Sequence, residues 1–308
     1  MGEKMYDNNS GDTDIRKQGV WSMKWALKIA CKIVLSRLPI PYAWWQSIGL
    51  FRHGRMDHAE YALKIFCLHS NRAYPEGLPA GTSALELGPG DSIASAIIAK
   101  AYGASQIWLA DVGNFARKDV HFYRVLALAL AGRGLAAPDL THAITFEDVL
   151  NACNVRYLTE GLRSLRQIPD GTIDFIWSHS VLEHVRKPQF ADTLLELFRV
   201  MKPGAYTSHN IDFQDHLSHA LNNLRFSERR WESYLFANSG FYTNRIPAVV
   251  MHNMFKQAGF DLIREEFGRW PKLPIPRKSL AEEFERFADE ELLCRTSYVL
   301  LRKRPESQ

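Results

Sequence analysis

Short apolar runs and longer amphipathic segments alternate along the C-terminal two thirds of the chain. Apolar runs with the length of buried strands occupy residues 83–87, 106–110, 173–178, 205–211, 260–267 and 297–303, with a weaker one at 155–158. Segments with helical spacing lie at about 57–68, 92–102, 117–130, 190–200 and 248–258. Alternation of this kind is typical of a parallel sheet covered by helices on both faces. We therefore predict an α/β domain.

Glycine and proline residues mark the start of this domain. Pro75, Gly77, Pro79 and Gly81 precede the first strand and predict a loop there. We expect three parts: a flexible tail at 1–18, a helical extension or lid at 19–80, and the main domain at 81–308. Within that domain, residues 212–245 are polar and aromatic, break the alternation, and are expected to form an insertion.

The extension predicts an amphipathic helix at 19–37. Lys24, Lys28 and Lys32 share one of its faces, which disfavours a membrane span. Two hypotheses remain open. The helix packs on the main domain as a lid, or residues 19–50 make a peripheral contact with a membrane whose anionic head groups attract the lysines.

Composition narrows the class of protein. The net charge is +4, but Lys and Arg are scattered among acids, so nucleic acid is not an expected partner. The four cysteines are widely spaced, which gives neither a disulfide framework nor a zinc motif and suits a reducing compartment. The first eighteen residues show no secretory signal. We expect a cytoplasmic protein, at the inner face of the membrane if the extension binds there.

A glycine-containing turn joins the first strand to the next helix. In Leu-Glu-Leu-Gly-Pro-Gly-Asp-Ser (85–92), Gly88 and Gly90 let the backbone turn tightly and approach a ligand. The following helix start offers unpaired amides. Dinucleotide-binding turns place a third glycine where this chain has Ser92. A carboxylate at Glu86 would repel a pyrophosphate, but it suits the ammonium and sulfonium groups of S-adenosylmethionine.

Asp111 strengthens this interpretation. It ends the second apolar strand and lies 25 residues after Glu86. A carboxylate at that place can accept hydrogen bonds from both hydroxyls of a ribose. The alternative is that Asp111 caps the next helix.

Further motifs complete the pattern of a known family. Residues 173–185 read Ile-Asp-Phe-Ile-Trp-Ser-His-Ser-Val-Leu-Glu-His-Val, and Lys-Pro-Gly follows at 202–204. Over about residues 83–211 the chain resembles the type 11 family of class I S-adenosylmethionine-dependent methyltransferases. The departures are Ser92 for the third glycine and Ala205 where a second glycine often follows Lys-Pro-Gly. The resemblance implies a Rossmann-like sheet of seven strands, mostly parallel, with an antiparallel C-terminal strand in a hairpin.

The resemblance also implies a cofactor site. It assigns the methionine end of the cofactor to Glu86 and the turn after it, the ribose to Asp111, the floor to residues 178–179 and the adenine end to the region of 160–162. The implied cofactor-binding residues are Glu86, Gly88, Pro89, Gly90, Asp111, Val112, Gly161, Leu162, Ser178 and His179.

Candidate catalytic residues follow the fourth and fifth strands. Methyl transfer to a hydroxyl requires alignment of donor and acceptor and a base that removes a proton. His209, Asp212 and His184 are the candidates. On an extended strand His209 and Asp212 face opposite ways, so we treat them as separate hypotheses. A divalent metal held by Asp212, Asp215 and a histidine is an alternative that no motif supports, and a polar loop with capping side chains is another.

A looser resemblance concerns the acceptor. Residues 38–57 and 209–245 resemble methyltransferases of bacterial surface-polysaccharide and glycan pathways, which implies O-methylation of a sugar hydroxyl, on a free or lipid-linked glycan. Aromatic residues of the insertion would stack on sugar rings or pack in a small core; they are Phe226, Trp231, Tyr234, Phe236, Phe241 and Tyr242. The alternatives are a methyltransferase for a non-sugar small molecule and an NAD-binding oxidoreductase of similar fold.

Overall fold

The computed structural model describes Ile29 and residues 56–305. The helix expected at 19–37 and the membrane contact expected at 19–50 therefore lie outside the described residues, apart from Ile29. Within residues 56–305, no helix combines the length and the apolar character that crossing a membrane requires.

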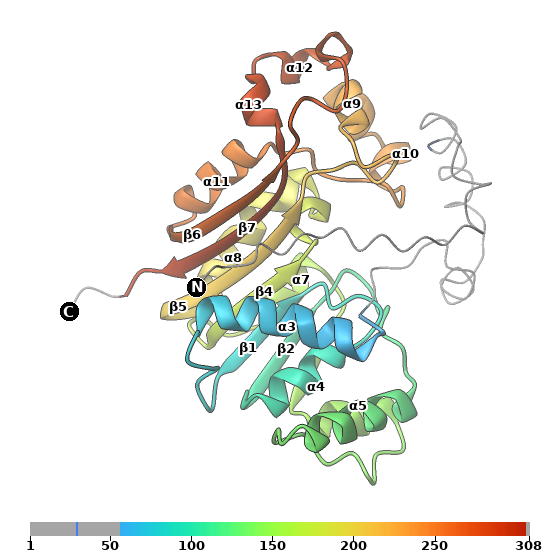
Figure 1. Ribbon diagram of the computed structural model, residues 1–308, viewed down its shortest axis with the longest axis vertical. Helices are drawn as coiled ribbons and strands as arrows, with labels where there is room; N and C mark the ends of the chain where they lie inside the picture. Colours follow the sequence, from blue (N-terminus) through green and yellow to red (C-terminus); the bar gives the residue numbers. More distant parts are fainter. Residues whose placement is uncertain (1–28, 30–55, 306–308) are drawn as a thin grey trace, which may run out of the picture.

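A seven-stranded sheet forms the centre of the molecule (Figure 1). Its order is β3-β2-β1-β4-β5-β7-β6, and β7 runs antiparallel to both of its neighbours while the pairs among β1 to β5 are parallel. The predicted Rossmann-like sheet is thus confirmed. The strands are β1 (Ser83–Leu87), β2 (Gln106–Ala110), β3 (Val155–Leu158), β4 (Ile173–His179), β5 (Met201–Asp212), β6 (Phe260–Arg269) and β7 (Cys294–Lys303).

Helices cover both faces of the sheet, because each strand alternates its side chains between two apolar layers. One layer holds Phe175 and Trp177 and is closed by α3 (Ala59–Ala73), α4 (Ala94–Ala101), α5 (Val120–Gly132) and α6 (Phe146–Ala152). The other holds Leu85 and Ile176 and is closed by α7 (Leu162–Leu165), α8 (Phe190–Val200) and α11 (Ala248–Gln257).

Helix α3 belongs to the part of the chain that we predicted to be an extension. It is longer than expected and ends at Ala73, two residues before Pro75, because a proline disfavours helical backbone before it. Phe66 meets Trp177 edge-on, with 5.5 Å between ring centroids, so α3 packs directly on the sheet. The boundary at 80/81 stays a prediction.

The Val-Leu-Glu-His-Val segment forms a short 3-10 turn, η2 (Leu182–His184), and a second such turn, η3 (Lys187–Gln189), precedes α8, which begins at Phe190 as predicted. One local expectation was wrong. Lys-Pro-Gly lies inside β5 rather than before it. Gly204 has a φ of 80°, and the pairing of β5 with β4 shifts register at this point.

The last two strands, β6 and β7, pair antiparallel as expected. The connection between them, residues 270–293, was not predicted to fold, and it forms η5 (Arg277–Ser279), α12 (Glu282–Glu285) and α13 (Asp289–Leu292). The expected insertion contains η4 (Asn222–Arg225), α9 (Glu228–Trp231) and α10 (Tyr234–Ala237). We call residues 213–247 and 270–293 together the cap.

The two cap segments pack on each other at one end of the sheet (Figure 1). The Ala281 amide donates to the Leu224 carbonyl at 2.9 Å. Phe284 and Leu280, from the second segment, share an apolar cluster with Leu221 and Leu224. A separate cluster joins the first segment to Ile29, and its aromatic members are Trp231, Phe236, Phe241 and Tyr242. The cap is therefore a small folded unit with its own cores.

Helix α8 provides a test of the packing against β4 and β5. Leu197 is fully buried, whereas Leu195 on the same helix is 54% exposed. We expect Leu197→Ala to lower the free energy of unfolding by about 2–5 kcal/mol, because it removes buried methyl groups and leaves a cavity. Leu195→Ala is the matched control and should change it by no more than about 0.5 kcal/mol. Urea unfolding followed by fluorescence measures both; equal effects would mean that α8 does not pack as described.

Candidate functional site

The turn after β1 is shaped by a close approach of another segment. Gly88 and Gly90 have φ values of 65° and 68°, a region that favours glycine, and Pro89 between them is buried. A Cβ at Gly88 would lie 2.5 Å from a methyl carbon of Val181, which follows β4. Glycine is therefore required at position 88 for both its conformation and its lack of a side chain.

Asp111 lies at the end of β2 beside this turn. Its carboxylate accepts hydrogen bonds from the backbone amides of Gly90, at 3.1 Å, and of Val112, at 2.7 Å. The carbonyl of Asp111 accepts from the amide of Gly161 at 2.7 Å. The structure thus brings together the acid after β2, the turn after β1 and the loop after β3.

Glu86 occupies a different place from the other acid. Its side chain is 3% exposed and points into the layer under α4, where it accepts hydrogen bonds from the Ser95 hydroxyl and, at 3.1 Å, from Trp177 Nε1. Burial raises the pKa of Glu86 to about 7. Both carboxyl oxygens are engaged by the protein, so Glu86 fixes α4 and β4 around the turn.

The residues at this edge fit the cofactor that the resemblance implies. Val112 is 78% exposed and offers an apolar surface beside Asp111. Gly161, with a φ of 59°, leaves room there, because a Cβ at this position would lie 3.3 Å from Val112; Leu162 follows it as the first residue of α7. This edge thus offers a carboxylate for a ribose, an apolar surface for a base and a glycine turn for close backbone contact. These three features suit S-adenosylmethionine.

Ser178 and His179 end β4 and face opposite layers. The Ser178 hydroxyl lies 2.7 Å from His209 Nδ1, whereas His179 Nδ1 lies 3.2 Å from His69 Nε2 on α3. His69 in turn lies 2.8 Å from the Ser208 hydroxyl. Burial lowers the pKa of His179 to about 4 and that of His69 well below its usual value. This pair holds α3 on the sheet as neutral imidazoles, a role that the sequence did not suggest.

His209 is inside the protein. It is 1% exposed, its ring stacks on Phe255 of α11, and its two nitrogens lie 2.7 Å from the hydroxyls of Ser178 and Thr207. Burial lowers its pKa to about 3. The structure therefore does not bring His209 together with Asp212, which lies on the other side of β5.

Asp212 and His184 lie on the cap side of the sheet. The Asp212 carboxylate accepts two hydrogen bonds from Gln214, and burial raises its pKa above the usual range. His184 Nδ1 lies 2.9 Å from the Tyr242 carbonyl, and its ring stacks on His216 with 4.9 Å between centroids. These two candidates share one region, since the charge of His184 acts on Asp212.

The metal alternative is not supported by the geometry of its ligands. The Asp215 carboxylate accepts hydrogen bonds from the backbone amides of Leu217, Ser218 and Asn222, so it caps a loop. Across residues 56–305, no three His, Cys, Asp or Glu side chains are grouped so as to hold a metal ion.

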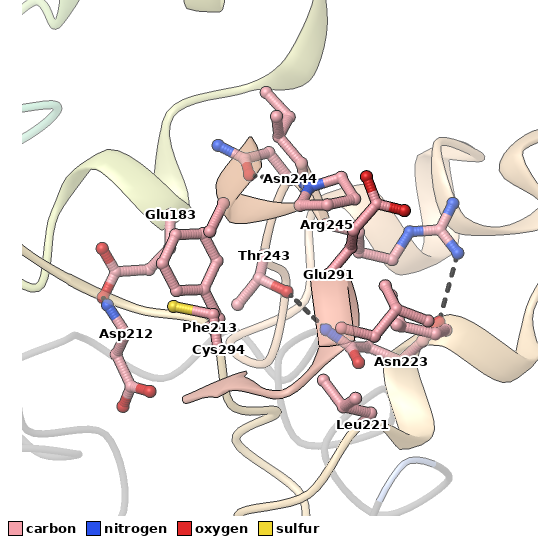
Figure 2. Close-up of a pocket in the computed structure, with 15 residues that line it drawn as sticks. Glu183, Asp212, Phe213, Leu221, Asn223, Thr243, Asn244, Arg245, Glu291 and Cys294 are labelled. Atoms are coloured by element: carbon pink, nitrogen blue, oxygen red, sulfur yellow. Dashed lines mark hydrogen bonds between the residues drawn. The ribbon is translucent and has the colours of Figure 1, made fainter. Parts of the chain in front are cut away.

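A cavity that is partly open to solvent lies between the sheet end and the cap (Figure 2). Glu183 and Asp212 line one side of it, and Asn223 and Arg245 line the other. Cys294, the first residue of β7, also contributes. The cavity thus sits beyond the carboxyl ends of β4 and β5, where ligands bind in open α/β sheets.

Glu183 was not among the predicted site residues, although it lies in the motif at residues 173–185. Glu183 is 2% exposed, accepts a hydrogen bond from the Asp212 amide at 3.2 Å through Oε1, and has a pKa raised well above its usual value by burial. Its Oε2 has no partner in the described structure. The one signal in the sequence was an acid between two apolar residues and a histidine.

Comparison with known proteins finds one family model that matches the central part of the chain. Residues 85–208 match the family model described as a methyltransferase domain. A search of curated proteins finds no match.

The fold is similar to solved structures at low sequence identity. A methyltransferase from Methanosarcina mazei is 14% identical, with a TM-score of 0.45, over 75% of this chain and 97% of that one. One from Mesorhizobium loti is 17% identical, with a TM-score of 0.42, over 81% and 100%. The N-methyltransferase NodS from Bradyrhizobium japonicum is 11% identical, with a TM-score of 0.41, over 80% and 87%. At these scores the likeness carries no argument about function.

The close approach at Gly88 predicts the effect of adding one methyl group. Gly88→Ala should weaken binding of S-adenosylhomocysteine by at least about tenfold, because Val181 must move and the turn opens. Gly171→Ala is the matched control, since Gly171 has a φ of 59° but open space around it. Titration calorimetry measures both affinities. Equal affinities for the two variants would contradict the role of the turn.

The raised pKa of Glu86 predicts a pH dependence of stability. The folded protein binds the proton more tightly than the unfolded chain, so the contribution of Glu86 to stability falls as the pH rises from about 4.5 to about 7. The loss amounts to about 3 kcal/mol. Glu86→Gln should lack it, so the difference in unfolding free energy between wild type and variant should shrink by that amount over this range.

Urea unfolding at several pH values measures this difference. Comparison with the variant cancels the buried histidines, whose lowered pKa values act in the opposite direction. Glu76→Gln, at an exposed glutamate, is the control. A difference that stays constant between pH 4.5 and 7.5 would show that Glu86 ionises normally.

Proposed function

We propose that this chain, in which residues 85–208 form an S-adenosylmethionine-dependent methyltransferase domain, transfers the methyl group to a hydroxyl of a sugar or glycan. The observation that supports this acceptor class is the cavity under the cap. Apolar side chains such as Phe213 and Leu221 form part of its lining, and its polar groups are carboxyl, amide and hydroxyl side chains and an arginine whose charge is already paired.

The cavity and the cofactor turn are linked by one short segment. Val181 contacts Gly88, and Glu183, two residues later, lines the cavity. The Cα atoms of residues 181 and 183 are at most about 7.6 Å apart. An acceptor in the cavity would therefore lie next to the turn that holds the methionine end of the cofactor, as methyl transfer requires.

The chain's own residues have positioning and proton-transfer roles. When bound, S-adenosylmethionine supplies an electrophilic methyl carbon on a sulfonium. Gly88, Gly90 and Asp111 hold that cofactor, and the cap excludes water from the acceptor. Asp212 lines the cavity and is the better placed of the candidate bases, because His209 lies on the opposite side of β5 and both of its ring nitrogens contact hydroxyls.

The aromatic residues between positions 226 and 242 are not among the residues that line the cavity, and most of them pack inside the cap. Trp231, Phe236, Phe241 and Tyr242 are buried in a cluster of their own, while Tyr234 is 79% exposed. Few of these aromatic rings are therefore available to stack on a sugar. Polar recognition inside the cavity carries the proposal instead.

The alternatives differ in their support. An NAD-binding oxidoreductase is disfavoured by the methyltransferase family match and by Ser92, which stands where a dinucleotide turn has its third glycine. A hydroxyl on a non-sugar small molecule would use the same cavity and the same base, and the acceptor test below separates it from a glycan.

The test supplies S-adenosylmethionine with a labelled methyl group and a panel of neutral glycosides, glycan extracts, phenols and amines. We expect a gain of one labelled methyl on a sugar oxygen, identified by mass spectrometry. Asp212→Asn should slow this transfer by at least about tenfold and leave the affinity for S-adenosylhomocysteine unchanged, because the base is lost but the turn is not.

The control is Asp192→Asn, which changes an exposed carboxylate on α8. Methylation of an amine or a phenol in place of a sugar hydroxyl would overturn the proposal. So would a result in which no glycan is methylated and Asp212→Asn methylates another acceptor as fast as the wild type.

A further inference from the structure

Three buried polar atoms, on side chains that line the same cavity, have no hydrogen-bond partner in the described structure. They are Oε2 of Glu183, Oδ1 of Asn223 and Nε of Arg245. An unpaired buried polar atom costs about 1–3 kcal/mol, so three in one cavity call for a physical reason. A ligand that supplies the missing partners is such a reason.

Each of the three side chains is fixed by its remaining atoms. Asn223 Nδ2 donates to the Thr243 hydroxyl at 3.0 Å. The Arg245 guanidinium donates to the Asn223 carbonyl at 3.1 Å and to Glu228 at 2.8 Å. Glu183 is held by the Asp212 amide. The free atoms are thus preorganised, and binding a ligand would cost little side-chain entropy.

Backbone geometry supports a built site. Arg245 has a φ of 58°, which a residue with a side chain adopts at a cost of about 1–2 kcal/mol. Asn244 next to it clamps the turn that carries Glu183: its Nδ2 donates to the carbonyls of Leu182, at 2.8 Å, and Val185, at 3.1 Å. One strained dipeptide of the cap therefore sets the positions of both sides of the cavity.

The pattern of donors and acceptors favours hydroxyl groups. Arg245 Nε–H donates, Asn223 Oδ1 accepts, and the Glu183 carboxyl can do either, depending on its proton. A hydroxyl both donates and accepts, so a ligand with adjacent hydroxyls can satisfy all three atoms. A purely anionic ligand offers acceptors only and would leave Asn223 Oδ1 unpaired.

Charge also excludes ionic ligands. The positive charge of Arg245 is paired with Glu228, and Glu232 and Glu283 act on it as well. Asp212 lies on the opposite side and, when ionised, would repel a phosphate or a uronate. An ammonium group would meet the guanidinium of Arg245. A neutral ligand is the one that this arrangement favours.

From these observations we infer that Glu183, Asn223 and Arg245 form the recognition site for a neutral, polyhydroxylated acceptor. The inference rests on the proposed function and narrows it: the acceptor hydroxyls are selected by the cap, and uronates, phosphosugars and amino sugars are rejected. These residues determine specificity and position the acceptor, and the proton transfer assigned to Asp212 is separate from their role.

The test is ligand-observed saturation-transfer NMR on the full chain with S-adenosylhomocysteine present. The neutral probes are methyl α-D-glucopyranoside, methyl α-D-mannopyranoside and myo-inositol; the charged probes are glucuronate, glucose 6-phosphate and glucosamine. We expect binding of at least one neutral probe, and binding weaker by at least fivefold for its charged counterparts.

Two variants test the site itself. Asn223→Ala and Glu183→Gln should each weaken binding of the neutral probe by at least fivefold and raise the KM of its methylation more than they lower kcat. Glu290→Gln, at an exposed acid of α13, is the matched control. The affinity for S-adenosylhomocysteine, which binds elsewhere, verifies that each variant is folded.

Three outcomes would overturn the inference: no neutral probe binds, charged probes bind more tightly, or both variants bind like wild type. The last result, together with continued methylation of a sugar hydroxyl, would leave the proposed function standing and would assign only water to the unpaired atoms. Probe binding that depends on Asn223, without any methyl transfer, would support the recognition site and contradict the proposed function.

Discussion

The close approach of Val181 to Gly88 is the contact on which the rest of the site depends. It brings the turn after Leu87 and the segment that leaves β4 to within van der Waals distance, so that this turn and the cavity share the segment of Val181–Glu183 as a common wall. Ser180, with a φ of 55°, redirects the chain at that point, and its hydroxyl donates to the Asn210 side chain at 3.1 Å. The bend that makes this contact possible is therefore paid for by a local hydrogen bond to β5.

The sheet and the cap stabilise this region in different ways. On the sheet side, apolar layers and neutral buried histidines hold α3 and α11 against β4 and β5. On the cap side, polar side chains tie loops to each other; Arg245 alone joins the Asn223 carbonyl, Glu228 and the Trp231 ring. Apolar side chains can shift against each other at a small cost in free energy. Hydrogen bonds and ion pairs depend on direction and break when the loops shift, so they keep the cavity in a defined shape.

Much of the core fold could be predicted, because its signals are local. β1 and β3 have the bounds that the apolar runs predicted, and Gly88, Gly90 and Asp111 meet in space because the carboxyl ends of adjacent parallel strands share an edge. Alternation along β5 also predicted that His209 and Asp212 face opposite ways. The sequence of β5 alone could not predict that α11 covers the side of His209 and that the cap lies on the side of Asp212.

The cavity could not be predicted, because it depends on contacts between distant segments. Glu183 is buried only because Asn244, some sixty residues later, clamps its turn. The cap helices α12 and α13 were missed for a related reason: helices of four residues have too little periodicity to be recognised, and they are stable only through packing of Phe284 and Leu292 in the cap.

The cap has one further consequence, which concerns how such proteins diverge. Both of its segments leave and re-enter the core at the same end of the sheet, between β5 and α11 and between β6 and β7. Insertions, deletions or exchanges within residues 213–247 and 270–293 that retain Asn244, which clamps the turn of Glu183, therefore leave the strand register and the turn after β1 intact. Remodelling of the cap around a retained Asn244 can therefore change the shape and the lining of the cavity while the sheet and the turn after β1 stay unchanged.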